Sequence, residues 1–509
     1  MATVPSASDV SLTEEDVLTC VRVLRAIEQD RSHLTRLTQA QRIELLSVAG
    51  RVVKPERSDM VKMAKAFRRA DREKDKERDR EALERTALRV QRKSEVYRPL
   101  WLERPDQQPS SEQSELKQER TCYICKQSFT RVHRYYDSMC ESCGEFNYSK
   151  REQHADLTGQ YALVSGARVK IGYQTSLKLL RAGAYVIATT RFPVDAADRY
   201  SQEPDYRSFS DRLEVHGLDL RHTPSVELFA RMLLDRLPRL DHIINNACQT
   251  VRRPAGFYAH LLAREATSFE TLPDMQRVLL KQRHSLRHTL EQSSSIKAIS
   301  PTMQIHAEGL IDSAELSQRR YLDDDFRAGD ALFPTGRYDE DRQQVDLRDV
   351  NSWRLRLHEV DTPELLEVQL VNAVAPYILN ARLKPLMLRT SGRHKHIVNV
   401  SAMEGQFYRI FKTDKHPHTN MAKAALNMMT RTSAPDFVKD GIHMNSVDTG
   451  WVTDEDPAVH ATRKAQEGFS PPLDIIDGAA RILDPIFVGA LTGEHVWGQF
   501  LKDYKPTAW

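Results

Sequence analysis

The chain has 509 residues, 40% of them hydrophobic and 28% charged, and its formal net charge is +3. This composition is ordinary for a soluble globular protein with more than one domain, and the nearly balanced charge leaves nucleic-acid binding undecided. No run of about eighteen apolar residues occurs, which excludes a membrane-spanning helix. The first residues lack the basic and apolar segments of a secretory signal, so a cytoplasmic or nuclear protein is expected.

Residues 1–102 are predicted to form an α-helical region. Apolar residues recur at helical spacing between Val17 and Val53, and a strongly charged segment follows from Arg68 to Arg85. Opposite charges three and four residues apart favour a solvated spacer helix, although a helix that binds a protein partner or nucleic acid has the same pattern. Residues 103–120 are polar and contain Pro and Ser, which indicates a linker.

Two C-x-x-C pairs follow the linker and predict a metal site within residues 121–150. Two thiolate pairs on turns complete a closed tetrahedron, and their spacing suits one structural zinc ion in a small ribbon-like module. Four thiolates leave no open coordination position, so the ion is expected to support structure and not catalysis. Basic and aromatic residues between the pairs leave open that the module contacts a protein. The predicted ligands are Cys122, Cys125, Cys140 and Cys143.

From about residue 155 the pattern alternates between apolar strands and amphipathic helices. This alternation predicts an α/β fold of Rossmann type, a doubly wound parallel sheet over residues 155–509. Residues 255–360 are too long for one crossover and are interpreted as an insertion that forms a lid, a substrate cap or an interface. The predicted strands are Tyr161–Val164, Tyr185–Thr190, Leu213–Gly217, His242–Asn245, His396–Val400 and His443–Val447.

The stretch from residue 161 to residue 191 is typical of a βαβ unit with a phosphate-binding turn. Gly166 and Gly172 bracket the turn between the first strand and the following helix. Backbone N–H groups at a helix N-terminus, together with the helix dipole, favour an anion there. The stretch therefore predicts a site for the pyrophosphate of a dinucleotide.

Several motifs in this order resemble the short-chain dehydrogenase/reductase family over residues 157–254 and 361–505. The turn SGARVKIG is similar to the family's TGxxxGxG, with Lys170 in place of the middle glycine. The motif NNAC is similar to NNAG, with Cys248 in place of glycine. The remaining similar segments are LDL (218–220), IVNVSAMEG (397–405), MAKAALNMMTRT (421–432) and NSVDTGWVTDE (445–455).

The resemblance implies a nicotinamide dinucleotide cofactor. Arg191 ends the second strand, where the family recognises the adenosine ribose, and an arginine there suits a 2′-phosphate, so NADP is favoured over NAD. Arg168 and Lys170 add positive charge nearby. The implied cofactor-binding residues are Gly166, Arg168, Lys170, Ile171, Gly172, Arg191, Asp219, Leu220, Asn246, Ala247, Lys423 and Thr453.

The catalytic positions of the family are only partly matched. Lys423 and Asn372 correspond to its lysine and helix asparagine, but Thr419 stands at the tyrosine position and a threonine hydroxyl is too weak an acid to replace a phenol. Ala402 takes the place of the serine, with Ser401 one residue earlier. An alternative proton donor is expected in the loop between Ala402 and Thr419. This loop carries Tyr408, His416 and His418, of which His418 and Tyr408 are preferred.

Two functions therefore remain open. The first is an NADP-dependent oxidoreductase that acts on an unidentified carbonyl or alcohol with an atypical proton donor. The alternative is a catalytically silent NADP-binding sensor or scaffold, in which the zinc module contacts a partner. A nucleic-acid-associated zinc protein is the least favoured hypothesis, and a homo-oligomer is compatible with the pattern. The substrate is not encoded in any motif, because specificity in this fold lies in variable loops.

Overall fold

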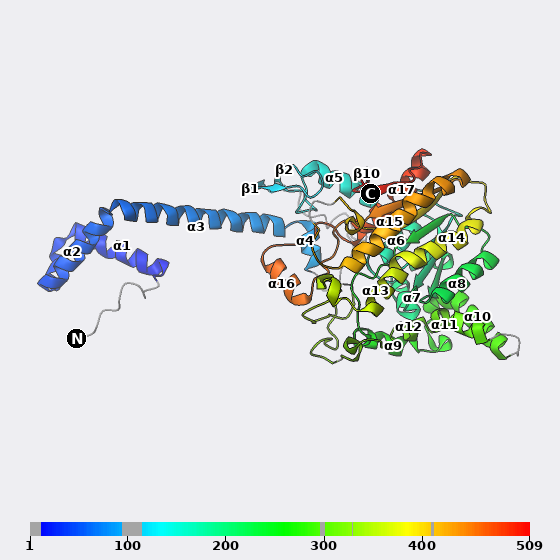
Figure 1. The fold of residues 1–509 in the computed structure, drawn as a ribbon. Coiled ribbons are helices and arrows are strands. Elements are labelled where there is room, and N and C mark those ends of the chain that lie inside the picture. Colours follow the sequence, from blue (N-terminus) through cyan, green and yellow to red (C-terminus); the bar gives the residue numbers. More distant parts are fainter. Residues whose placement is uncertain (1–11, 94–114, 296–300, 328, 340, 409–411) are drawn as a thin grey trace. The chain divides into compact units, whose positions relative to one another are not determined.

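The computed structural model describes residues 12–93, 115–295, 301–327, 329–339, 341–408 and 412–509. The chain divides into two compact units, Met1–Glu77 and Arg78–Trp509, which are described separately. Figure 1 labels the α-helices of both units and the strands β1, β2 and β10. Among the described residues, no helix combines the length and apolar character needed to cross a bilayer.

The first unit is helical, as predicted. It contains α1 (Glu14–Gln29), the short 3-10 helix Arg31–Arg36, α2 (Gln39–Val53) and the beginning of α3 (Arg57–Glu84). Capping boxes start α1 at Thr13 and α2 at Thr38, where the side chain of the third helical residue returns to the cap. No residue of α1 or α2 is buried, so these helices are held by caps and local contacts.

The second unit begins with the end of α3, which is followed by the cysteine module. It consists of α4 (Ala87–Arg92), the antiparallel pair β1 (Glu115–Thr121) and β2 (Ser128–Arg131), and α5 (Glu141–Glu152). The prediction of a linker up to residue 120 is wrong for residues 115–120, which belong to β1; the rest of that segment lies outside the described residues. The strand escapes sequence analysis because Leu116 is its only buried residue, and pairing with β2 stabilises an otherwise polar segment.

An eight-stranded sheet forms the centre of this unit, in the order β10-β9-β8-β7-β6-β3-β4-β5. All neighbours are parallel except the terminal pair β9–β10. The six predicted strands are confirmed within one residue at each end, whereas β9 and β10 have three residues each and were missed. The strands are β3 (Tyr161–Ser165), β4 (Tyr185–Thr190), β5 (Leu213–Gly217), β6 (His242–Asn245), β7 (Lys395–Ser401), β8 (Ile442–Asp448), β9 (Phe500–Lys502) and β10 (Lys505–Thr507).

Helices cover both faces of the sheet, which is why its strands are almost continuously apolar. One hydrophobic core lies under α6 (Lys170–Arg181), α7 (Pro193–Ser201) and α17 (Ile475–Thr492). The other lies under α8 (Thr223–Arg236), α14 (Ala375–Met387) and α15 (Pro417–Phe437). This arrangement is the predicted Rossmann-type fold, and the parallel pairing of its strands brings their carboxyl ends to one end of the sheet.

The insertion is mostly helical and lies beside the edge strand β5. It comprises α9 (Ala259–Glu265), α10 (Asp274–Ser295), α11 (Pro301–Ile311) and α12 (Ser313–Leu316), and α13 (Thr362–Gln369) and α16 (Ala458–Gln466) follow it in the chain. A side chain at Gly217 on β5 would meet Arg283 of α10 and the backbone of Leu310 on α11. Both helices therefore pack closely against this strand.

Candidate active site

A cavity of about 1530 Å³ lies at the carboxyl edge of the sheet. Its walls come from the residues that follow β3, β4, β6, β7 and β8, from the insertion, and from the cysteine module. Open α/β sheets bind ligands in this position. Every residue predicted to bind the cofactor lines this one cavity, from Gly166 to Thr453.

The glycine turn at the end of β3 is held by close backbone approach. Gly166 has φ +68°, and a Cβ on Gly172 would lie 2.2 Å from the Gly166 carbonyl oxygen and 2.3 Å from Asn246 Nδ2. Asn246 Nδ2 donates to the carbonyl oxygens of Ser165 and Gly166 at 3.1 and 3.2 Å. The turn therefore needs glycine at both positions, and it directs the N-terminus of α6 toward the cavity.

Lys170 stands where the family has its middle glycine, and its backbone adopts the left-handed conformation with φ +55°. Its Nζ lies 3.8 Å from Asp341 Oδ2 of the insertion. Burial would raise the pKa of Glu455, but the charge of Lys170, together with the hydrogen bond from Thr453 and the charge of Arg253, lowers it below its usual value. Thr453 donates to Glu455 at 2.7 Å. The departure from the family pattern thus keeps the glycine-like backbone and adds a cation at the turn.

Arg191 at the end of β4 makes no ion pair with a described carboxylate, although its charge contributes to lowering the pKa of Asp219. Its Nη2 donates to Tyr258 Oη at 2.9 Å, and none of the described carboxylates lies within 4 Å of it. Burial would raise the pKa of Tyr258, but Arg191 and Arg168 lower it below the usual phenol value. Arg168 is instead paired with Asp195 at 2.7 Å. Of these two arginines, Arg191 is therefore the one available to an anion.

Asp219 and Leu220 follow β5 and also line the cavity. The Asp219 carboxylate accepts from Arg221 Nη2 at 2.7 Å. Burial alone would raise the pKa of Asp219, but the Arg221 guanidinium outweighs it and holds the pKa below its usual value. The Asp219 carboxylate is thus already paired with a cation.

The catalytic side of the cavity is formed by β7, β8 and α15. Lys423 is buried, and its Nζ donates to the Val400 carbonyl oxygen at 2.7 Å. The Ser401 hydroxyl lines the cavity, is buried, and has no hydrogen-bond partner among the described residues. A buried hydroxyl without a partner is uncommon and is explained where a ligand completes its bonding. The structure thus brings Ser401 and Lys423 to the same cavity.

Three predicted catalytic residues do not reach the cavity wall. Asn372 lies in a π-helical turn, Leu370–Val374, and binds the backbone of Gln249 through both its amide atoms, at 2.7 and 3.1 Å. His418 is buried with its Nε2 3.3 Å from Glu364 Oε1, and Tyr408 is 89% exposed. The expectation that His418 or Tyr408 donates a proton is therefore not supported, because one faces α13 and the other faces solvent.

His416 is the loop residue that does line the cavity. Its ring stacks on Trp353 with centroids 4.0 Å apart, and burial lowers its pKa. It caps α15 with φ 42°, a strained conformation of the kind that clusters at functional sites. His416, Asn420 and Lys423 follow helical i, i+4 and i+7 spacing, and all three line the cavity. Pro417 at the first helical position was the sequence signal that could have placed His416 at this cap.

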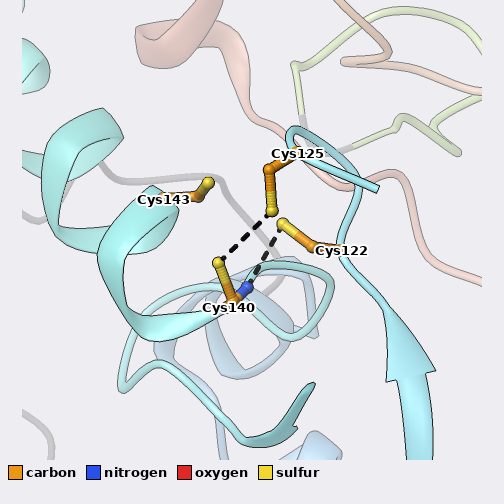
Figure 2. Close-up of side chains that lie close together, drawn as sticks. All are labelled: Cys122, Cys125, Cys140 and Cys143. Carbon is orange, nitrogen blue, oxygen red and sulfur yellow. Dashed lines mark hydrogen bonds between the residues drawn. The ribbon is translucent and has the colours of Figure 1, made fainter. Parts of the chain in front are cut away.

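The four cysteines of the module lie together, as Figure 2 shows, with Cys143 on α5 and Cys122 and Cys125 on the turn after β1. Their sulfur atoms all lie within 4.8 Å of one another, and Cys125 Sγ is 3.7 Å from Cys140 Sγ. Zinc–sulfur bonds of about 2.3 Å in a tetrahedron place the sulfurs roughly 3.8 Å apart. The cluster fits a four-cysteine zinc module.

The cysteine module belongs to the same compact unit as the sheet. Arg151 of α5 pairs with Asp474 at 2.6 Å, and Tyr135 donates to the same carboxylate at 2.6 Å. Tyr123, inside the first C-x-x-C, lines the cavity, and its Oη accepts from the Trp451 N–H at 3.1 Å. Sequence analysis missed this residue, because no local pattern shows against which surface a small module packs.

Comparison with known proteins agrees with this geometry. A family profile described as enoyl-(acyl carrier protein) reductase matches residues 351–469. The bovine dehydrogenase/reductase SDR family member 13 is 35% identical over 104 residues, which cover 20% of this chain and 27% of that protein. The chain belongs to the short-chain dehydrogenase/reductase family.

Relatives of this short-chain dehydrogenase/reductase differ in how much of the chain they match. Uncharacterized protein R665 of Acanthamoeba polyphaga mimivirus is 32% identical over 381 residues, 72% of this chain and 71% of that protein. Mouse retinol dehydrogenase 14 is 36% identical over 116 residues, 20% of this chain and 34% of its own length. The mimivirus match therefore extends over far more of the chain than the dehydrogenase matches.

Solved structures with a similar fold include the NADPH-bound carbonyl reductase from chicken fatty liver. It is 16% identical, has a TM-score of 0.40, and the match covers 69% of this chain and 100% of that one. The Pseudomonas aeruginosa RhlG/NADP complex is 16% identical with a TM-score of 0.42, covering 69% and 96%.

Proposed function

We propose that the protein is an NADP-dependent oxidoreductase that interconverts an alcohol and a carbonyl compound. The family supports the reaction class, and Arg191 is the observation that favours NADP. This guanidinium lines the cavity at the end of β4 and has no carboxylate within 4 Å among the described side chains. A 2′-phosphate would supply the missing anion through charge-assisted hydrogen bonds. The nicotinamide, when bound, supplies or accepts the hydride.

The chain's own residues divide into those that bind and those that act on the substrate. The turn at Gly166 and Gly172 and the N-terminus of α6 hold the pyrophosphate. Lys423 lies buried beside the end of β7, where it binds the ribose next to the reacting ring. The unpartnered hydroxyl of Ser401 donates to the substrate oxygen. All of these groups line the same cavity.

His416 takes the place of the missing phenol in this proposal. It lies on the cavity wall one helical turn before Thr419, and its lowered pKa keeps the imidazole neutral at pH 7. A neutral imidazole accepts the proton of an alcohol, whereas reduction of a carbonyl requires the protonated ring. Oxidation of the alcohol is therefore the direction favoured at neutral pH by this residue.

The test is cofactor binding followed by turnover. Fluorescence titration and thermal shift with NADPH and NADH should show binding, with NADPH the tighter ligand. A panel of alcohols, ketones and aldehydes is then assayed with both cofactors. Absence of binding to either cofactor would refute the proposal. Tight NADPH binding without turnover of the panel would favour a catalytically silent sensor.

We also propose that the four-cysteine module holds one structural zinc ion. The sulfur separations support it, and Tyr123 would connect the ion to the cavity. A mercurial that reacts with thiolates should release about one zinc ion per chain, and Cys125→Ser with Cys143→Ser should remove this release. No release from the wild-type chain purified with zinc would contradict the assignment.

A further inference from the structure

Five histidines lie close together at the end of the sheet where the parallel strands begin, opposite the end that carries the cavity. His242, His396 and His443 occupy neighbouring strands and are direct register partners, His242 with His396 and His396 with His443. His394 precedes β7 and His495 precedes β9. Residues in register on adjacent parallel strands point to the same face, so the strands place these rings in one row. Nothing in the proposed reaction uses them.

Three of these rings already have the spacing of metal ligands. Ring nitrogens of His394, His396 and His495 lie within 4.8 Å of one another, and His396 Nε2 is 3.2 Å from His495 Nδ1. The ring centroids are 5.2, 5.3 and 5.1 Å apart. For metal–nitrogen bonds of about 2.0–2.1 Å in a tetrahedron, the nitrogens are roughly 3.3 Å apart and the ring centroids about 5.2 Å apart.

The surroundings orient the rings and leave room between them. His394 Nε2 lies 3.0 Å from the Ile486 carbonyl oxygen, so its Nδ1 is the nitrogen left for a ligand. An N–H to a backbone carbonyl is the usual second hydrogen bond of a metal-binding imidazole. A Cβ on Gly489 of α17 would lie 2.3 Å from His495 Nδ1 and 3.1 Å from His396 Nε2. The glycine therefore keeps the space faced by these two nitrogens open.

The ligand type and the nearby charge indicate which ions the cluster would bind. Because Arg393 repels cations, affinity has to come from coordination to nitrogen, which favours zinc, nickel or copper over magnesium or calcium.

We propose that His394, His396 and His495 form a second metal site, which binds a divalent transition-metal ion such as Zn²⁺. Three protein nitrogens leave a fourth position for water, and His394 and His495 are partly exposed, so the ion reaches the site from solvent. The ion would link β7 to the segment before β9 and thereby fix the C-terminal part of the sheet. The proposal is independent of the proposed oxidoreductase function.

The experiment uses the full chain, stripped of metal and titrated with Zn²⁺ by calorimetry. The wild type should bind about two ions, and Cys125→Ser with Cys143→Ser about one. In the double-serine protein, a further His495→Ala or His394→Ala substitution should abolish binding of the remaining ion or lower the Zn²⁺ affinity at least about 100-fold. His358→Ala, an exposed histidine outside both clusters, is the matched control and should leave both ions.

Two further measurements guard against misfolded variants. Gly489→Ala, which fills the space without removing a ligand, should weaken Zn²⁺ binding to the histidines. Wild-type crystals soaked in Zn²⁺ should show an anomalous peak between the three rings. The proposal is overturned if the double-serine protein binds no Zn²⁺, if the histidine variants bind as tightly as their parent, or if the peak is absent. In those cases the three rings serve only in packing.

Discussion

The two halves of the cavity are constrained in different ways. The turn half, which contains Gly166, Gly172 and Arg191, depends on backbone approach: a side chain at Gly172 would collide with the carbonyl of Gly166. The α15 half, which contains Ser401, His416 and Lys423, depends on which side chains reach the cavity. The first half keeps the family pattern except at Lys170, whereas the second half keeps Lys423 but has Thr419 at the tyrosine position. Where two backbone segments approach closely, only glycine fits. Where a side chain supplies the chemistry, a nearby residue that reaches the same cavity can supply it instead.

The largest expected effect tests the backbone constraint. Gly172→Ala places a Cβ 2.2 Å from the Gly166 carbonyl oxygen, so the turn must move. We expect NADPH affinity to fall at least about 100-fold in a fluorescence titration, because the N–H groups of the turn lose their direction. Gly392→Ala, where the new methyl group meets nothing within 4 Å, is the control. An NADPH affinity within twofold of the wild-type value would show that the turn does not require glycine at this position.

A substitution in the α15 half should affect turnover and not binding. His416→Gln is expected to lower kcat about 100-fold with NADPH affinity unchanged, since proton transfer is lost. His358→Gln serves as the exposed control. Because the pKa of His416 is lowered, wild-type alcohol oxidation should rise with pH, and the midpoint of the rise should lie below the usual pKa of histidine, about 6.5. A profile that continues to rise above pH 8 would indicate another base.

The charge of Arg191 should separate the two cofactors. Arg191→Gln is expected to reduce NADPH affinity about 10- to 100-fold and to leave NADH affinity almost unchanged, because only NADPH carries the 2′-phosphate. The control is Arg207→Gln, an exposed arginine on the short 3-10 helix Tyr206–Ser208. An equal loss for both cofactors would mean that Arg191 supports the fold of the turn half instead.

The smallest expected effect concerns the contact between the cysteine module and the α15 half. Tyr123→Phe removes the acceptor of the Trp451 N–H, a hydrogen bond worth about 0.5–1.5 kcal/mol. We expect cofactor affinity to fall roughly 2- to 10-fold while zinc content stays constant. Tyr148→Phe, a tyrosine of the same module outside the cavity wall, should bind the cofactor normally. Loss of zinc in Tyr123→Phe would show that the effect is not local.

Sequence patterns predicted the sheet well because its central strands are buried on both faces and read as apolar runs. They failed for β1, whose seven residues include only one buried side chain, and for β9 and β10, which are too short to show a period. The charged helix and the capping box at Thr38 were predictable from local rules.

The cofactor side of the cavity could be predicted because its residues follow strand ends directly, and the carboxyl ends of parallel strands meet at one edge. The proposed role of His416 could not be predicted. His416 and His418 differ by two residues, but α15 begins between them and turns one toward the cavity and the other toward Glu364. The position of Tyr123 at the cavity could not be predicted either, because it depends on packing between segments that are distant in sequence.

The insertion has a consequence for the behaviour of the folded chain at high concentration. An edge strand offers unpaired backbone groups to any extended peptide, and this is a common start of aggregation. Here α10 and α11 pack against β5, and the Asp219 N–H donates to the Gly309 carbonyl oxygen at 2.9 Å. The opposite edge ends in β10, only three residues long. In the described part of the chain, one edge strand thus ends against the insertion and the other is very short, which limits the length over which another strand could pair with the sheet.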